Sequence, residues 1–264
     1  MSHELKNNII TILEFYKELG FERLPLNYSN ELQVKCQSVK VSKYQSVKDP
    51  DTLTLGNSDT SFVTRYSSLN KEDALKSLRE EIGDCQRCKL SKGRTHIVFG
   101  EGNANASVMF IGEAPGKDED IQARPFVGEA GQILTRLINN MGKASGLNFT
   151  RTDVYIANIV KCRPPMNRDP QADEIAACLP FLERQIDTIA PKIIMALGKV
   201  AAHTLMGLET PLAKFSIAKI RGQFFEYKGI PAMPTYHPAY FLRNPKDKPL
   251  TWADAQAVLQ KLSK

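Results

Sequence analysis

Four of the five cysteines have a spacing that could bind a metal centre. Cys85 and Cys88 form a C-x-x-C pair, whereas Cys162 and Cys178 lie far along the chain, in a basic loop and on the predicted helix after it. Four thiolates suit zinc or a cubane iron–sulfur cluster, but a zinc ribbon normally has a second C-x-x-C within about 15–20 residues. The scattered spacing therefore favours a cluster, and Cys36 is left over.

A second candidate site is the glycine- and acid-rich segment 112–134, which begins where a predicted strand ends. Gly112 permits close approaches that a Cβ would prevent, and Glu113 and Glu119 belong to a crowd of carboxylates that would repel phosphate. Phe126 is an apolar residue within an otherwise polar, glycine-flanked loop. These residues suit a binding site, and the alternative is a solvated acidic turn with Phe126 as a core anchor.

A third candidate is the segment YIANIVKCRPPMNRDP, in which an apolar strand carries Asn158 and runs into a basic loop. A buried, unpaired amide costs about 1–3 kcal/mol, so Asn158 needs partners, either within the protein or on a ligand. Lys161, Arg163 and Arg168 could contact phosphates or simply solvate the loop.

The fourth candidate is the segment MPTYHPAYFLRNP near the C-terminus. His237 could donate a hydrogen bond to a developing anion, although a single histidine is more often a structural residue. The following run contains aromatic, apolar and basic side chains that could probe a DNA groove and its phosphates. Its members are Tyr240, Phe241, Leu242 and Arg243.

The composition is that of a globular protein with a mild preference for a polyanionic partner. The chain has 264 residues, a formal net charge of +6 and a pI of about 9.0. The N-terminus lacks the apolar block of a signal peptide, and no run of about 18 apolar residues predicts a membrane span. We therefore expect a cytoplasmic protein without membrane contact, in which cysteines stay reduced.

Short β-branched runs alternate with helical patterns through most of the chain, which predicts βαβ units and a mainly parallel sheet. Strands are expected at 107–112, 154–160 and 192–198, and helices at 130–141, 170–189 and 200–206. A further helix begins at Asn70 with a capping pattern and leads to Cys85. The candidate motifs follow the strand ends, where open α/β sheets bind ligands.

The first part of the chain has a different character. Residues 1–20 have the apolar spacing of an amphipathic helix, and residues 27–69 are polar with little periodicity. We place a boundary near Asn70, with an N-terminal extension at 1–69 and the main domain at 70–264. The alternative is that the extension wraps onto the main domain.

The order and combination of these motifs resemble the family 4 uracil-DNA glycosylases. The shared segments are GEAPG at 112–116, PFVGEAG at 125–131, NIVKCRPPMNRDP at 158–170 and HPAYFLRNP at 237–245. The resemblance covers about 75–264 and includes the four cysteines. It implies a three-layer α/β/α fold and a monofunctional enzyme that flips deoxyuridine out of DNA, releases uracil and leaves an abasic site.

The resemblance also implies roles for individual residues. Phe126 would stack on the flipped uracil, Asn158 would pair with its edge, and His237 would stabilise the departing anion. Glu113 would position water near the sugar cation, and Glu119 would help to exclude a 5-methyl group. The remaining implied contacts are Gly112 beside the base, Lys161, Arg163, Arg168, Tyr240 and Arg243 on DNA, and Cys85, Cys88, Cys162 and Cys178 on a structural [4Fe–4S] cluster.

Departures from neighbouring families narrow this interpretation. The loop KCRPPMNRDP lacks the inserted histidine-containing segment of the covalently trapping relatives, so turnover is expected, and the glutamate of GEAPG argues against family 5. We expect a monomer acting on single- and double-stranded DNA that contains uracil. Two alternatives are a non-catalytic, cluster-bearing DNA-binding module and a zinc-dependent nucleotide hydrolase.

Overall fold

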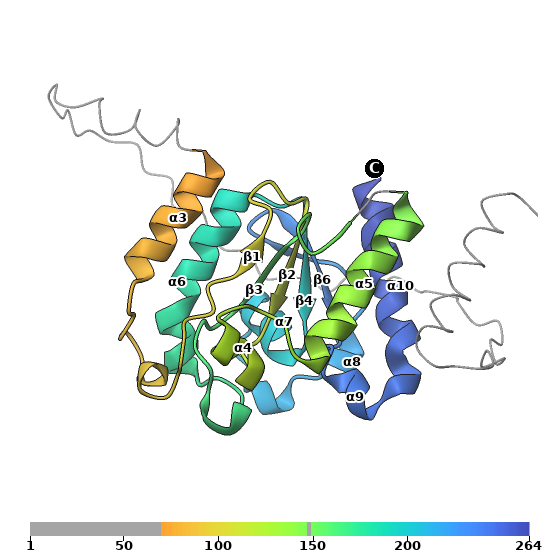
Figure 1. Cartoon of the computed structure of the whole chain (residues 1–264). Coiled ribbons are helices and arrows are strands. Elements are labelled where there is room, and N and C mark those ends of the chain that lie inside the picture. The colour runs from red at the N-terminus through yellow and green to blue at the C-terminus, as the bar shows by residue number, and fades with distance from the viewer. Residues whose placement is uncertain (1–69, 147–148, 264) are drawn as a thin grey trace, which may run out of the picture. The chain divides into compact units, whose positions relative to one another are not determined.

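A six-stranded sheet forms the centre of the protein in the computed structural model, which describes residues 70–146 and 149–263 (Figure 1). The strand order is β1-β3-β2-β4-β6-β5, with β3, β2, β4 and β6 parallel and antiparallel strands at both edges. The strands are β1 (Glu101–Gly102), β2 (Val108–Gly112), β3 (Tyr155–Asn158), β4 (Ile193–Leu197), β5 (Phe225–Tyr227) and β6 (Ile230–Thr235). The expected mainly parallel sheet is confirmed.

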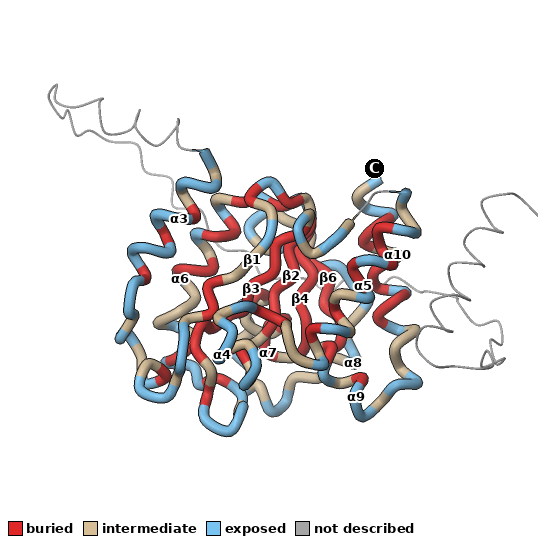
Figure 2. Tube along the Cα trace, viewed as in Figure 1, coloured by how far each residue is buried: buried red, intermediate tan, exposed pale blue. Residues whose placement is uncertain are grey.

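Helices cover both faces of this sheet, and the buried residues concentrate in the strands between them (Figure 2). Helices α3 and α6 pack together on one side, whereas α5 and α10 pack together on the other (Figure 1). The helices are α3 (Lys71–Ile82), α4 (Lys117–Gln122), α5 (Glu129–Ser145), α6 (Ala172–Ile189), α7 (Lys199–Leu205), α8 (Ile217–Ile220), α9 (Tyr240–Arg243) and α10 (Lys248–Leu262). Short 3-10 turns occur at η1 (Lys89–Lys92), η2 (Pro165–Asn167), η3 (Leu212–Lys214) and η4 (Pro245–Asp247).

Alternation along the strands divides the core into two layers. Met109 and Ile111 of β2 belong to one apolar cluster with Leu182 and Ile186 of α6. The intervening Phe110 is also fully buried and points to the opposite face, because successive strand residues alternate. The expected three-layer α/β/α arrangement is therefore confirmed.

Helix α3 begins as its sequence predicts. The side chain of Asn70 accepts a hydrogen bond from the backbone N–H of Glu72 at 3.3 Å, which caps the first turn. Leu78 and Ile82 then pack with Phe181 of α6. This packing holds the segment that follows α3, with its first two cysteines, beside α6.

The sequence prediction missed β6 and α10. Pro231 and Pro234 have no backbone N–H to donate within β6. Because prolines are rare inside strands, their presence argued against predicting a strand from the sequence. Strand β6 nevertheless pairs with β4 through residues 232–235. The expected helix at 1–20 and the domain boundary involve residues outside the described range, so both stay predictions. Among the described residues, no helix is long and apolar enough to cross a membrane.

Candidate active site

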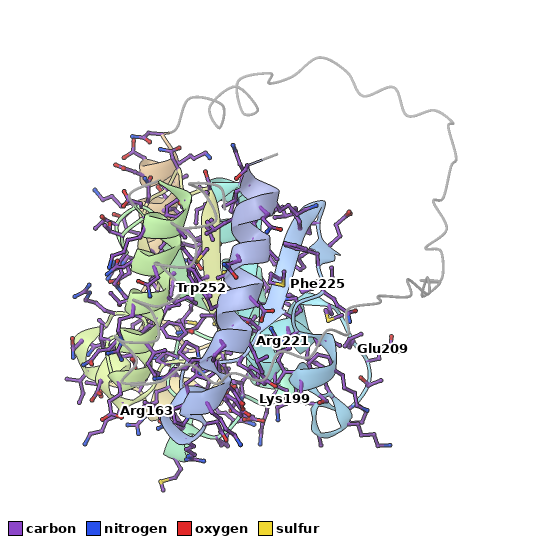
Figure 3. The ribbon with its side chains drawn as sticks, turned by 90° about the vertical axis from the view of Figure 1, so that its right-hand side faces the viewer. Arg163, Lys199, Glu209, Arg221, Phe225 and Trp252 are labelled. Carbon is purple, nitrogen blue, oxygen red and sulfur yellow. The ribbon has the colours of Figure 1, made fainter. Side chains whose placement is uncertain are left out.

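A cleft of about 840 Å³ opens at the carboxyl ends of the central strands. Its walls come from the loops after β2, β3, β4 and β6, so segments far apart in the sequence meet there. Arg163 and Lys199 lie at this end, the lower end of Figure 3. The predicted residues that line the cleft are Glu113, Glu119, Phe126, Asn158, Arg168, His237, Tyr240 and Arg243.

Gly112, Phe126 and Asn158 meet at the base of the cleft. Gly112 of β2 is in parallel register with Asn158 of β3. A Cβ on Gly112 would lie 2.4 Å from the Phe126 ring and 2.5 Å from Asn158 Oδ1, so only glycine permits this arrangement. Asn158 is 1% exposed, and its Oδ1 has no hydrogen-bond partner among the residues that the structure describes. The cleft therefore holds a buried acceptor that a ligand can satisfy.

The backbone around Phe126 is held in an unusual conformation. Phe126 has φ 52°, in the left-handed region that non-glycine residues seldom adopt. Arg151 donates hydrogen bonds to the carbonyls of Pro125 at 2.7 Å and Phe126 at 2.9 Å. A Cβ on Gly131 would lie 1.9 Å from the Phe126 carbonyl oxygen, so α5 can approach this loop only with glycine there. Sequence reasoning missed Arg151, because no local pattern connects it to this loop.

Glu119 also fixes this loop. Its Oε1 accepts hydrogen bonds from the N–H groups of Val127 at 2.8 Å and Gly128 at 2.9 Å. Its Oε2 accepts one from Gly116 at 3.1 Å. The carboxylate therefore ties the start of α4 to the segment after Phe126. Its expected exclusion of a 5-methyl group stays a prediction.

His237 follows β6 and presents a neutral imidazole. Its Nδ1 accepts a hydrogen bond from the Ala239 N–H at 3.2 Å, which places the ring proton on Nε2. Burial lowers the pKa of His237 to about 4, so the ring stays uncharged at neutral pH. The His237 ring centroid lies 5.5 Å from that of Phe126. The remaining donor, Nε2–H, is thus available beside Phe126.

Glu113 is an acid of the cleft whose pKa is raised well above its ordinary value. Burial and the nearby Asp169 carboxylate raise the pKa of Glu113 to about 7, and Lys199 acts in the opposite direction. Lys199 Nζ lies 2.9 Å from Asp169 Oδ2. Sequence reasoning missed Asp169 and Lys199. For Lys199, the sequence did contain a signal, because this residue directly follows the glycine at the end of β4.

The expected DNA contact of Lys161 is wrong. Lys161 is 2% exposed, and its Nζ donates to the Asn158 carbonyl at 2.9 Å and to Gln185 Oε1 at 2.6 Å. Gln185 donates in turn to the hydroxyl of Tyr155 at 3.1 Å and to the carbonyl of Phe99 at 3.0 Å. The side chain turns inward because these buried oxygens need donors, and burial lowers its pKa to about 8.

The other side chains expected to contact DNA differ in how firmly contacts within the protein hold them. Arg168 makes a two-pronged ion pair with the buried carboxylate of Glu174, at 2.6 and 2.8 Å. Tyr240 stacks on Tyr236, with ring centroids 4.5 Å apart, and donates its hydroxyl to Asp247 at 2.7 Å. Arg163 donates from Nε to Asn167, whereas Arg243 is exposed at the cleft. Arg168 and Tyr240 are therefore fixed by the protein before any ligand binds.

The four predicted cysteines converge on one small cavity beside Phe181 and Ile97. Three hydrogen-bond donors lie within 3.6 Å of their sulfurs. Arg87 contacts the Cys85 sulfur at 3.3 Å, Arg94 contacts that of Cys162 at 3.6 Å, and the backbone N–H of Lys161 contacts that of Cys178 at 3.3 Å. Cationic and N–H donors stabilise thiolate ligands. The cysteines are Cys85, Cys88, Cys162 and Cys178.

Thiolate sulfurs such as these are ligands for either zinc or an iron–sulfur cluster. Among the described residues, no three Cys, His, Asp or Glu side chains lie close enough to bind one metal ion. A zinc ion would need four ligands at about 2.0–2.3 Å from one point. An iron–sulfur cluster would also be held by four cysteine thiolates, so the residue types present fit such a group.

Comparisons with known proteins agree with this geometry. Residues 99–262 match the family described as the Uracil DNA glycosylase superfamily. The type-4 uracil-DNA glycosylase of Saccharolobus solfataricus is 47% identical over 72% of this chain and 88% of its own length. That of Sulfurisphaera tokodaii is 44% identical over 70% of this chain and 84% of its own length. The type-5 uracil-DNA glycosylase of Pyrobaculum aerophilum is only 30% identical, over 67% of this chain and 81% of its own.

The fold and the matched region thus define a uracil-DNA glycosylase. Within that class, the chain belongs to the type-4 uracil-DNA glycosylases.

Proposed function

We propose that this chain hydrolyses the N-glycosidic bond of deoxyuridine in DNA, releasing uracil and leaving an abasic site. The observation that carries the proposal is the Oδ1 of Asn158, which is buried beside the ring of Phe126 and has no hydrogen-bond partner in the part of the chain that the structure describes. Leaving such an acceptor unpaired costs about 1–3 kcal/mol, which a ligand with a matching donor recovers. Uracil offers that donor at N3–H.

Recognition of the base combines pairing and stacking. Asn158 Oδ1 accepts from uracil N3–H, and its amide nitrogen donates to O4. Cytosine has an acceptor at N3 and a donor at its exocyclic nitrogen, so it reverses both requirements. Phe126 stacks on the base, with its backbone held by Arg151. The target nucleotide must leave the helix to reach this cleft, as in other enzymes that act on bases.

Catalysis stabilises the charges that develop as the bond breaks. His237 donates from Nε2–H to uracil O2 as the base leaves with the bonding electron pair. With a pKa of about 4, the ring stays neutral at neutral pH, so Nδ1 continues to accept from the Ala239 N–H and holds the Nε2–H donor in place. Glu113, as a carboxylate, positions a water molecule that attacks the sugar cation. The water oxygen forms the new bond to the sugar carbon, and Glu113 accepts its proton.

The DNA backbone lies against the rim of the cleft. Arg163 and Arg243 are the side chains that we assign to phosphate contacts, while Arg168 and Tyr240 shape the rim. None of these residues requires a second strand, so we propose activity on both single- and double-stranded DNA.

We further propose that Cys85, Cys88, Cys162 and Cys178 hold a [4Fe–4S] cluster. Three hydrogen-bond donors lie 3.3–3.6 Å from the sulfurs of Cys85, Cys162 and Cys178, and such donors stabilise thiolate ligands. The cluster supplies a cross-link between the segment after α3, the loop after β3 and α6. Lys161, beside Cys162, contacts both the Cys178 sulfur and the Asn158 carbonyl, and the cluster would support this loop without taking part in bond cleavage.

Oligonucleotides with one uracil, single- and double-stranded, test the function directly. Incubation followed by alkali should cleave the strand at the uracil, whereas incubation without alkali should leave the strand intact. Matched oligonucleotides with thymine or cytosine should stay uncut in both treatments. Strand cleavage without alkali, or an imine trapped by borohydride, would contradict a hydrolytic, monofunctional reaction.

A further inference from the structure

The loop between β3 and α6 exposes an apolar side chain that the proposed function has not used. Met166, in the 3-10 turn η2, is 93% exposed, compared with 54% for Ile121 and 48% for Leu242. An isolated, exposed apolar side chain is ordinary, but one that is almost fully exposed at the edge of a binding cleft calls for an explanation.

The backbone that presents Met166 is strained. Met166 has φ 56° and ψ 19°, and the next residue, Asn167, has φ 54°. Methionine has none of the local hydrogen bonding that lets asparagine adopt the left-handed region, so its conformation costs free energy. Two such residues in succession turn the chain outward and leave the methionine side chain in solvent.

The surrounding contacts fix this conformation. The Asn167 N–H donates to the Pro164 carbonyl at 3.1 Å, and Arg163 Nε donates to Asn167 Oδ1 at 2.8 Å. Arg168, which follows, is anchored by its two-pronged ion pair with the buried Glu174. The strained turn is thus determined by hydrogen bonds on both sides of Met166.

The loop forms one side of the mouth of the cleft. Pro164, Asn167 and Arg168 line it, and the residues that line another side include Leu242 and Arg243 after β6. In Figure 1 the loop between β3 and α6 and helix α9 lie at the same end of the sheet, apart from one another. A duplex whose uracil enters this cleft must therefore pass both segments.

We propose that Met166 enters the DNA duplex beside the flipped uracil and packs against bases of the opposite strand. This inference rests on the proposed function. Methionine is unbranched and polarizable, and apolar side chains of this kind are used as wedges between base steps. A strained turn that holds such a side chain in solvent removes the cost of positioning it when DNA binds.

The role applies to duplex substrates alone. A single strand has no opposite strand for Met166 to contact, and its bases are unstacked at little cost. Met166 should therefore favour release of uracil from duplexes and have no effect on single strands. A residue that merely stabilises the fold would affect both substrates equally.

The test compares Met166→Asn with wild type on single- and double-stranded uracil substrates under single-turnover conditions. Asparagine tolerates the left-handed conformation better than methionine, so the variant should fold with an equal or higher Tm. We expect duplex cleavage to fall about tenfold, the effect of losing one well-packed apolar contact, with single-strand cleavage unchanged. Met166→Leu should retain most duplex activity, because leucine is also an apolar wedge residue.

A matched control is Phe224→Ala, which removes an apolar side chain that is 37% exposed next to the edge strand β5. It should change neither activity. Equal rates for Met166→Asn and wild type on duplexes, or equal losses on both substrates, would overturn the role of Met166. Absence of uracil release by wild type from single strands would instead overturn the proposed function.

Discussion

The cleft and the four-cysteine site differ in whether their key polar atoms have hydrogen-bond partners within the described residues. In the cleft, the Oδ1 of Asn158 is buried and has no hydrogen-bond partner within residues 70–146 and 149–263. At the cysteine site, donors lie 3.3–3.6 Å from the sulfurs of Cys85, Cys162 and Cys178. An unpaired acceptor is a group that a ligand must complete at each encounter, whereas surrounded sulfurs suit a permanent group. The cleft is therefore suited to binding a ligand transiently, whereas the four-cysteine site is suited to holding a permanent group.

Lys161 connects the two regions. Its backbone N–H donates to the Cys178 sulfur, and its side chain donates to the Asn158 carbonyl at 2.9 Å. Lys161 thus connects the four-cysteine site to Asn158, the residue that we propose pairs with uracil. Substitutions on either side of this connection should show whether the two regions can fail separately.

The largest effect is expected at the cysteine site. Replacing Cys162 with alanine should abolish iron binding and leave little soluble protein, because metal-binding free energy becomes folding free energy in such sites. Wild type purified under low oxygen should be brown with about four iron atoms per chain. Cys36→Ala is the matched control and should keep its iron. Stoichiometric zinc in wild type would contradict the cluster.

In the cleft, His237→Ala should lower the single-turnover cleavage rate by about 10²–10³, the usual loss of one donor to a developing oxyanion. Iron content and Tm should change little, because the ring makes its one described backbone contact locally, to Ala239. DNA affinity should also be nearly unchanged. An equal loss of affinity and rate would assign His237 to binding rather than catalysis.

Asn158→Asp should cost about 2–4 kcal/mol of transition-state stabilisation at pH 8, because the carboxylate cannot donate to O4 and repels the departing anion. A protonated aspartate presents the complement of cytosine, so weak release of cytosine should appear as the pH falls. Single-turnover assays on both bases from pH 5 to 8 measure this. Uracil cleavage at the wild-type rate would remove Asn158 from the site.

Lys161→Met tests the connection itself. The change keeps the length of the side chain but leaves the Asn158 carbonyl and Gln185 Oε1 without their donor, at a cost of about 1–3 kcal/mol in unfolding free energy. Iron content should persist, because Lys161 contacts the cysteine site through its backbone. Uracil cleavage should fall as Asn158 loses its support. Loss of iron with intact cleavage would reverse this assignment.

The smallest effect concerns the pH dependence that Glu113 imposes. Its pKa of about 7 predicts that cleavage falls about tenfold between pH 8 and pH 6, because the carboxylate is the active form. His237, with a pKa of about 4, contributes nothing in this range. Glu113→Gln should lower the rate and flatten the profile. A wild-type rate that is constant from pH 6 to 8 would contradict the proposed role.

Glu113 should also affect stability. Its folded-state pKa lies above the ordinary value of 4.5, so the folded protein holds a proton that the unfolded chain has released. Its contribution to stability therefore decreases as the pH rises from 4.5 to 7. Thermal unfolding should show that Glu113→Gln raises Tm at pH 8 more than at pH 5.

The sequence by itself determined the elements and the motifs. Local periodicity predicted β2, β3 and β4 and their helices within a few residues, because apolar alternation and capping are local properties. The motif residues Glu113, Phe126, Asn158 and His237 follow strands in the sequence, and parallel strands bring their ends to one edge. Strand β6 was missed because its prolines oppose a local signal for a strand.

Only the tertiary structure decided which way the side chains turn. Lys161 and Arg168 are basic residues of one loop, yet one donates to buried oxygens beneath the cleft and the other pairs with buried Glu174. Arg151 reaches the Phe126 loop from a distant part of the chain. Sequence gives a residue its charge and its donors, but the choice of partner depends on which unpaired buried groups the packed fold places within reach.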